Sequence, residues 1–288
     1  RAASRNTGSP PRAKPSSRIT LRTFHDQSTQ HSIPPLHRFV SSCLRVRNLP
    51  TMNTSTRDFL QKHFDTAFSA PDGIAKLREL ILTLAMQGKL VEQDPKDTPA
   101  WESKSESPNT VEELSYDETV ELPKGWAAVK LGCVVASNTG GGTPSKQNPA
   151  YWNGDIPWAS VKDVQKEKYL TATQDTISEV GLKNSSSNLI PPNRLIVVTR
   201  MGLGKLAINA IPIAINQDLR AIEPTEALQL DYAYLLFKTL KMEGSGMTVK
   251  GITVKALHEM PVIIPPLPEQ QRIVAKVDQL MAQCDELE

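Results

Sequence analysis

Apolar residues recur at helical spacing in two stretches of this chain. The first runs from residue 74 to residue 84 in steps of three and four positions, and it stops at Gly88, a common helix terminator. The second begins at Glu269 and steps by four, three, four and three positions, which is a heptad spacing. Both stretches predict amphipathic helices, and a further helix is predicted over residues 55–67.

The heptad stretch is too short to be identified as a coiled coil, so its apolar face needs a partner helix. The helix over residues 74–84 of the same chain is one candidate, and a second copy of the chain is the other. The residues expected to make this contact are Leu77, Ile81 and Leu84 on one helix and Ile273, Val277, Leu280, Cys284 and Leu287 on the other.

Between Trp126 and Ile222 the pattern changes, because short β-prone runs alternate with turn residues. The apolar run from Leu195 to Thr199 predicts a buried strand. The β-prone runs cover residues 128–135, 188–199 and 207–215, and the turn markers include Gly132, Asn148-Pro149, Asn153-Gly154, Pro191-Pro192, Gly202 and Gly204.

A helix over residues 231–242 and a last strand over residues 260–264 follow these runs. Strands and helices are therefore mixed along the chain. The predicted fold class is α+β, with one α/β domain flanked by short helices that can pair as a helical hairpin or a short coiled coil.

The first 51 residues differ from the rest. They carry nine basic residues and one acidic residue, with no sustained periodicity, so we expect them to be disordered. Their composition would suit an organelle transit peptide or a nucleic-acid-binding arm. We favour an upstream or vector-derived extension, because the first residue is Arg1 and the segment with helical periodicity opens at Met52.

The net charge of +2 conceals an uneven distribution of charge. Residues 128–220 carry ten basic and six acidic residues, whereas acidic residues are in excess over residues 52–127 and 221–288. A polyanion responds to local rather than summed charge. The basic segment between two acidic flanks therefore indicates a polyanionic partner.

Sequence patterns for catalysis are incomplete. Asn148-Pro-Ala-Tyr151 lacks one proline of the methyltransferase loop that holds a flipped base, and no glycine loop for S-adenosylmethionine precedes it. Asp163 and Lys166-Glu167-Lys168 have the wrong order for a nuclease, and the run Gly140–Lys146 has the wrong order for a P-loop. We expect no catalytic residue, metal or cofactor on this chain.

The three cysteines are far apart, which fits neither a disulfide framework nor a zinc site. No run of about 18 apolar residues predicts a membrane helix. A reducing cytoplasm is the expected location.

Four motifs in order resemble the target recognition domain of a Type I restriction-modification specificity subunit. They are Gly125-Trp126, GGTPS at 141–145, YWNGDIPW at 151–158 and Asn216-Gln-Asp-Leu-Arg220. Residues 77–90 and 264–274 resemble the helical segments that flank such domains in that family. The resemblance covers residues 55–288 and rests on several independent motifs, which makes it specific.

This resemblance implies a division of the chain into a helical segment (52–91), an acidic linker (92–124), one recognition domain (125–266) and the start of a spacer helix (267–288). It implies double-stranded DNA, the methyltransferase subunit, the restriction subunit through the complex and a possible second copy as partners, and no membrane. It places S-adenosylmethionine, ATP and Mg²⁺ on partner subunits.

Seven residues are candidates for DNA contacts, because arginine and lysine can bridge guanine and serine can bind phosphate. Arg200 and Lys205 are the preferred ones, since they flank Gly202 and Gly204 in a loop after a strand. Three glycines before Thr143 allow positive φ angles or close approach to a partner. The candidates are Ser145, Lys146, Ser160, Lys162, Arg200, Lys205 and Arg220.

The aromatic residues Tyr151, Trp152 and Trp158 are expected to belong mainly to the core, and Asn216–Asp218 is expected to serve the fold. Other functions stay open at this point. A stand-alone DNA methyltransferase or nuclease, a protein-interaction module and a truncated recognition cassette are the alternatives to a specificity subunit.

Overall fold

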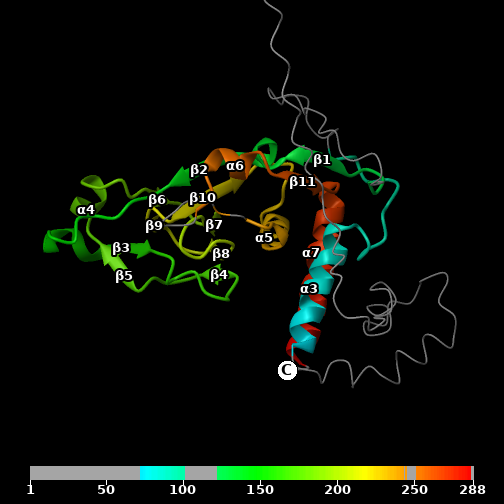
Figure 1. The fold of residues 1–288 in the computed structure, drawn as a ribbon, viewed down its shortest axis with the longest axis horizontal. Helices are drawn as coiled ribbons and strands as arrows, with labels where there is room; N and C mark the ends of the chain where they lie inside the picture. Colours follow the sequence, from blue (N-terminus) through cyan, green and yellow to red (C-terminus); the bar gives the residue numbers. More distant parts are fainter. Residues whose placement is uncertain (1–71, 101–121, 243, 245–250, 287–288) are drawn as a thin grey trace, which may run out of the picture. The chain divides into compact units, whose positions relative to one another are not determined.

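The computed structural model of the chain describes residues 72–100, 122–242, 244 and 251–286 (Figure 1). Within these residues the helices are α3 (Gly73–Met86), α4 (Glu179–Lys183), α5 (Leu230–Thr239), α6 (Val254–His258) and α7 (Leu267–Asp285), with short 3-10 helices η1 (Leu131–Val134) and η2 (Pro149–Tyr151). The strands are β1 (Ala127–Lys130), β2 (Val135–Gly140), β3 (Trp152–Ala159), β4 (Tyr169–Leu170), β5 (Asp175–Ile177), β6 (Leu189–Ile190), β7 (Leu195–Val198), β8 (Leu206–Asn209), β9 (Ile213–Ile215), β10 (Leu219–Pro224) and β11 (Pro261–Ile264). The predicted α+β class is confirmed. The helix predicted over residues 55–67 and the segment 1–51 lie outside the described residues.

A five-stranded sheet in the order β2-β10-β7-β8-β4 forms the centre of the domain. Leu195 and Val197 of β7 join the apolar core around α5, whereas Ile196 and Val198 join a second core with Ile215 of the four-stranded sheet β5-β3-β9-β6. Successive side chains of a strand point to opposite faces, so a strand covered on both faces is apolar at every position. The prediction of a buried strand here is therefore confirmed.

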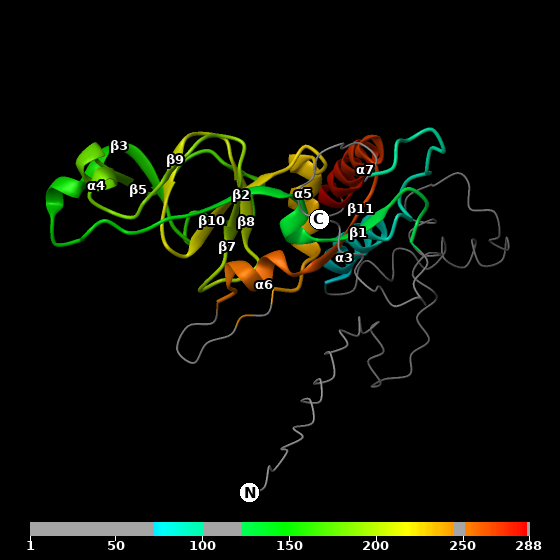
Figure 2. The same ribbon diagram turned by 90° about the horizontal axis from the view of Figure 1, so that it is seen from above.

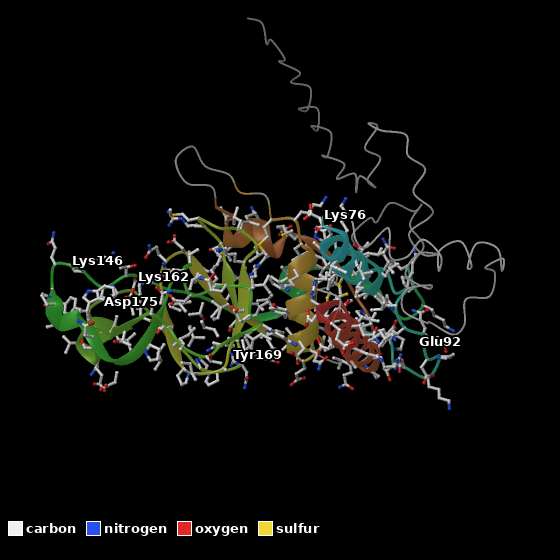
Figure 3. All side chains as sticks on the ribbon, turned by 90° about the horizontal axis from the view of Figure 1, so that it is seen from below. Lys76, Glu92, Lys146, Lys162, Tyr169 and Asp175 are labelled. Carbon is white, nitrogen blue, oxygen red and sulfur yellow. The ribbon has the colours of Figure 1, made fainter. Side chains whose placement is uncertain are left out.

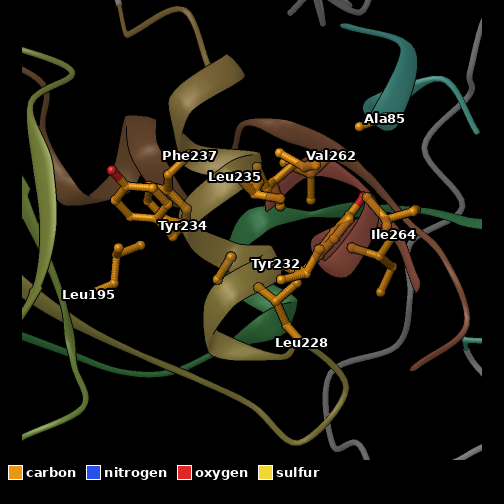
Figure 4. Packing of buried hydrophobic residues seen from close by; sticks show 14 of the residues in the cluster. Ala85, Leu195, Leu228, Tyr232, Tyr234, Leu235, Phe237, Val262 and Ile264 are labelled. Atoms are coloured by element: carbon orange, nitrogen blue, oxygen red, sulfur yellow. The ribbon is translucent and has the colours of Figure 1, made fainter. Parts of the chain in front are cut away.

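Helix α5 lies between the five-stranded sheet and the helices α3 and α7 (Figure 2). Its side chains Tyr232 and Phe237 are fully buried. Figure 4 shows Leu195 of the sheet on one side of this helix, with Val262 and Ile264 of β11 on the other. A helix that is apolar on most of its surface is a core element. The helix predicted over residues 231–242 is confirmed, but it ends at Thr239, three residues before the end of the predicted range.

Helices α3 and α7 pack against each other in antiparallel orientation (Figure 1). Arg78 near the start of α3 pairs with Asp285 at the end of α7, with 2.7 Å between nitrogen and oxygen. Leu287 lies outside the described residues. Helix α3 of the same chain therefore covers the apolar face of α7, and a second copy of the chain would have to bind to a different surface. The predicted contact residues that are buried in this core are Leu77, Ile81, Leu84, Ile273, Val277, Leu280 and Cys284.

The start of α7 is fixed by buried polar contacts beside the paired strands β1 and β11. Trp126 donates its indole N–H to Glu269 Oε2 at 3.0 Å, and both side chains are buried. Gln270 is fully buried and bonds three backbone groups. Arg272 pairs with Asp97. The polar run at the start of α7 therefore has a structural role, which is to attach the helix to the rest of the domain.

Residues 92–100, the first part of the predicted acidic linker, form hydrogen bonds and an ion pair with other parts of the chain. The backbone N–H of Ala100 donates to the carbonyl of Gly125 at 3.2 Å, and Gln93 donates to the carbonyl of Lys124. Together with the Asp97–Arg272 ion pair, these contacts hold residues 92–100 against the segment before β1 and against α7. Residues 101–121 lie outside the described part of the chain.

Asn153-Gly154, predicted as a turn, lies inside β3. Asn153 has a φ of 59°, and the register with β5 shifts between Trp152 and Ile156, so this is a bulge in a continuous strand. A Cβ at Gly154 would lie 2.5 Å from the Cα of Ser178, which leaves room only for glycine. The bulge needs the same residue types as a tight turn, which explains why the sequence pattern indicated a turn.

Burial raises the pKa of Glu269 above its ordinary value of 4.5, although the hydrogen bond from Trp126 acts in the opposite direction. The folded state then holds the carboxyl proton more tightly than the unfolded state. This contribution to stability is complete below about pH 4.5 and is lost as the pH rises through the folded-state pKa. We expect Glu269→Gln to gain stability relative to the wild type as the pH is raised from 4 to 7.

Melting temperatures of the two proteins across this pH range test the prediction, because other carboxyl groups titrate equally in both. A difference in melting temperature that is constant with pH would show that Glu269 holds its proton no more tightly in the folded state.

Candidate nucleic-acid interface

Four segments leave neighbouring strand ends, and the first of them runs on to the start of β3. Strands β2 and β7 run antiparallel to β10, so their last residues face its first residues, and the parallel strands β3 and β9 end together. Because loops that leave neighbouring strand ends are neighbours in space, the topology gathers these segments. They are residues 141–148, 160–165, 199–205 and 216–218, and together they are called the loop edge.

Direct contacts connect the segments of the loop edge. Thr143 Oγ1 donates to Gln217 Oε1. A Cβ at Gly202 would lie 3.3 Å from Val161 Cγ1, so the segments 160–165 and 199–205 touch. Backbone N–H groups donate to carbonyls, at 2.9 to 3.0 Å, from Gly142 to Ile215, from Asn216 to Ala159 and from Thr199 to Asp218.

The glycines before Thr143 serve the fold. None of them has a positive φ, in contrast to Gly202 and Gly204. A Cβ at Gly141 would lie 2.0 Å from the carbonyl oxygen of Ile215, and one at Gly142 would lie 2.0 Å from Ser186 Oγ. The close approach is therefore to the chain itself, at Ile215 for Gly141 and at Ser186 for Gly142, and the alternative of positive φ angles does not apply to these glycines.

Two tryptophans hold the first segment of the loop edge. Trp158 is buried and donates its indole N–H to the carbonyl of Gly142 at 3.1 Å. Trp152 is half-buried, donates to the carbonyl of Ser145 and meets Trp158 edge to face, with ring centroids 5.2 Å apart. The core role is confirmed for Trp158, while Trp152 and Tyr151 are only partly buried.

Most of the predicted contact residues lie on the loop edge. The cations exposed there are Lys146, Lys162, Arg200 and Lys205. The carboxylates of Asp163 and Asp218 are buried in the same segments, at 9% and 8% exposure. Figure 3 shows Lys146 near the end of the molecule and Lys162 further in, beside Asp175. Cations project outward while these two acids turn inward, so the surface of the loop edge is more basic than its sequence.

Hydrogen bonds within the loop edge explain why the acids turn inward. Asp163 Oδ2 accepts from the backbone N–H and the hydroxyl of Ser160, at 2.8 and 3.1 Å, and Oδ1 accepts from the N–H of Gln174. Asp218 accepts from Asn216, whose own side-chain oxygen accepts the N–H of Asp218 at 3.0 Å. The expected fold role of Asn216–Asp218 is therefore confirmed, and Ser160 serves a turn as well.

Two of the exposed cations lie close to acidic side chains. Lys162 Nζ lies 2.8 Å from Asp175 Oδ2 (Figure 3), and this hydrogen bond is the main cause that raises the pKa of Lys162. Arg200 Nη1 lies 3.6 Å from Asp218 Oδ1. The Lys162–Asp175 pair is at the surface, where ion pairs are weak and exchange readily with a phosphate partner, whereas in the second pair Asp218 is buried and Arg200 is exposed.

Arg220 departs from the prediction of a DNA contact. It is half-buried, with Nη2 donating to the carbonyl of Asn138 at 3.0 Å and Nε donating to the Asn138 side-chain oxygen. Burial lowers the pKa of this guanidinium. The side-chain nitrogen of Asn138 in turn contacts His258 Nε2 at 2.9 Å. Arg220 therefore ties β10 to β2, because Asn138 of β2 supplies both acceptors, and only Asn138 contacts α6.

The segment 199–205 connects β7 to β8 and contains the unusual backbone angles of the loop edge. Gly202 and Gly204 have φ angles of 140° and 87°, and Met201 has a φ of 53°. Met201 is also 67% exposed. Sequence reasoning missed this residue, since a single apolar residue in a glycine-rich loop gives no pattern.

Asn148 caps η2 by accepting the N–H of Ala150, so the Asn-Pro-Ala-Tyr run forms a local turn. Within the described ranges no three His, Cys, Asp or Glu side chains gather as metal ligands. No described helix is both long and apolar enough to cross a bilayer.

Residues 123–288 match the family model described as the Type I restriction modification DNA specificity domain. The chain is 33% identical over 178 residues to the MjaIX specificity subunit of Methanocaldococcus jannaschii, a match that covers 57% of this chain and 40% of that protein. It is 34% identical over 173 residues to the EcoR124I/EcoR124II specificity subunit of Escherichia coli, covering 56% of this chain and 43% of that protein. The matches thus span less than half the length of these relatives.

A solved structure described as the basis of complex assembly and conformational transition of the type I R-M system has the same fold, with a TM-score of 0.51. The two chains are 21% identical, and the match covers 87% of this chain and 61% of the other.

Proposed function

The chain belongs to the family of Type I restriction modification DNA specificity domains, and from this premise we propose that it selects the DNA target of a Type I restriction-modification complex. It binds double-stranded DNA through the loop edge. It is non-catalytic, and methylation and cleavage belong to a methyltransferase subunit and a restriction subunit of the complex.

The observation that carries the proposal is that the four cations of the loop edge are exposed, whereas the two acids of the same segments are buried. Exposed cations on these loops can follow a phosphate backbone, while the loops between them reach the base edges. Loops on a rigid scaffold are also the usual place for variable recognition.

The single family match supports recognition of one half of a bipartite target, because the curated relatives are more than twice as long as the matched segment. The helices α3 and α7 provide the surface on which the methyltransferase subunit docks. S-adenosylmethionine, ATP and Mg²⁺ belong to the partner subunits under this proposal.

The salt dependence of DNA binding tests the function. The full chain is titrated with short random-sequence duplexes, and affinity is measured by fluorescence anisotropy between about 50 and 200 mM salt. Three phosphate contacts, by Lys146, Lys162 and Lys205, predict that log affinity falls against log salt with a slope of about −2.7. Binding without salt dependence would instead favour a protein-interaction module.

Arg200→Ala is expected to weaken binding to a selected target about tenfold or more, and binding to random DNA much less, because we assign Arg200 to a base contact. Arg194→Ala is the matched control, since Arg194 precedes the same strand at its opposite end and pairs with Glu223. It should leave DNA affinity unchanged. Equal losses of Arg200→Ala on target and random DNA would reassign Arg200 to a phosphate.

A further inference from the structure

Resting on the proposed function, we propose that Met201 reads a base directly, by apolar contact with the C5-methyl group of a thymine in the major groove. This assigns a specificity-determining residue to the loop edge that neither charge nor hydrogen bonding would identify.

The backbone of Met201 is held in an unfavourable conformation. Its φ of 53° lies in the left-handed region, where an unbranched side chain other than asparagine or aspartate is uncommon. Such strain persists when the surrounding structure enforces it, and it is concentrated at binding sites. Here the flanking residues are fixed by the strand β7 and by a bridge from Arg200 to Gly251.

Met201 belongs to none of the apolar clusters that the described residues form. The side chain is 67% exposed, the highest value among the large hydrophobic residues that the structure describes. The others in this exposed group, Tyr169, Val180 and Leu189, lie outside the four loop-edge segments. A methionine that is both strained and exposed is therefore presented to something outside the chain.

The neighbours of Met201 fit a DNA groove. Arg200 and Lys205 are exposed on either side of it, so phosphates or base edges can be held near the methionine. Gly202 packs against Val161 of the segment 160–165, which supports the loop. A Cβ at Gly204 would meet nothing within 4 Å. The backbone at Gly204 can therefore approach DNA closely.

The loop between β7 and β8, and not the strands themselves, would enter a groove, because both strands lie inside the five-stranded sheet. The thymine methyl group lies in the major groove, so this is the groove that the proposal requires. A thioether has no strong donor or acceptor, so it cannot read the hydrogen-bonding pattern of a base pair. The apolar feature that the major groove presents is the thymine methyl group.

The test is a thermodynamic cycle between the methionine and that methyl group. A target is first selected with the full wild-type chain from a pool of random duplexes. Each thymine is then replaced in turn by deoxyuridine, which lacks only the methyl group. One replacement should weaken wild-type binding about fourfold, the effect of losing one buried methyl-sized contact.

Met201→Ala should bind the thymine target about fourfold more weakly or worse, and it should be insensitive to the deoxyuridine replacement. Its salt slope should equal that of the wild type, because no charge is removed. Met201→Leu should keep the sensitivity to deoxyuridine. Leu189→Ala, which truncates an exposed apolar residue elsewhere, is the control for general surface effects.

Three results of this cycle would overturn the proposal: a selected target without thymine, no effect of deoxyuridine at any position, or an effect of deoxyuridine that persists in Met201→Ala. A fourth comes from targets that carry 2-aminopurine in place of an adenine. A rise in its fluorescence on binding would show that Met201 wedges between unstacked bases instead of contacting a methyl group. In each case salt-dependent binding by the wild type would leave the proposed function standing. Absence of any salt-dependent binding would remove both.

Discussion

Gly141→Ala is expected to lower the free energy of unfolding by at least about 3 kcal/mol, the upper part of the range for overpacking a tight interior. The added Cβ would lie 2.0 Å from the carbonyl oxygen of Ile215 and 2.5 Å from its carbonyl carbon. A side-chain neighbour could rotate away, but this neighbour is backbone. Strand β9 is held between β3 and β6, so it has little freedom to retreat.

Urea unfolding followed by circular dichroism measures this loss. Gly204→Ala is the matched control, because it introduces the same methyl group into open space at a φ of 87°. Its cost is only that of a left-handed alanine, about 1 kcal/mol. If both variants lost the same amount, backbone conformation rather than the contact with Ile215 would explain the glycine at position 141.

This glycine shows where inference from the sequence stops. The motif at 141–145 is recognisable in the sequence, but its glycines indicate a close approach without saying to what. The contact partner, Ile215, lies in a strand far along the chain, and the pairing of β3 with β9 brings the two together. Local composition can mark a special position, whereas its contact depends on the topology.

The apolar patterns were more informative. The periodicity at 74–84 and from 269 onward predicted α3 and α7. Their pairing follows because the apolar face of a short helix stabilises the helix only when it packs against another element. The run at 195–198 predicted β7, since only a doubly covered strand needs four consecutive apolar residues.

The candidate site was predictable in residue type but less so in detail. Lys146, Arg200 and Lys205 are exposed, as basic residues in loops usually are. Arg220 instead meets Asn138 of the neighbouring strand, a contact that depends on strand register. Met201 needed the backbone angle before it could be noticed, because its exposure and its strain are properties of the folded loop.

The start of α7 provides the second large effect. Gln270→Ala is expected to cost about 3 to 5 kcal/mol, because each buried backbone group left without a partner costs about 1 to 3 kcal/mol. Gln270 Nε2 donates to the carbonyls of Ala227 and Pro265 at 2.9 and 3.0 Å, and Oε1 accepts the N–H of Gln229 at 2.8 Å. One amide thus connects the segment before α5 to the turn before α7.

Two further variants, also measured by urea unfolding, test whether the lost hydrogen bonds of the Gln270 amide cause this loss of stability. Gln270→Glu keeps an acceptor for Gln229 but brings carboxylate oxygens against two carbonyls, so it should be about as harmful as alanine. Gln271→Ala changes the exposed neighbour in the same motif and should stay within about 0.5 kcal/mol of the wild type. If Gln270→Glu were tolerated, the two donated bonds would contribute little, and packing of the side chain would explain its complete burial.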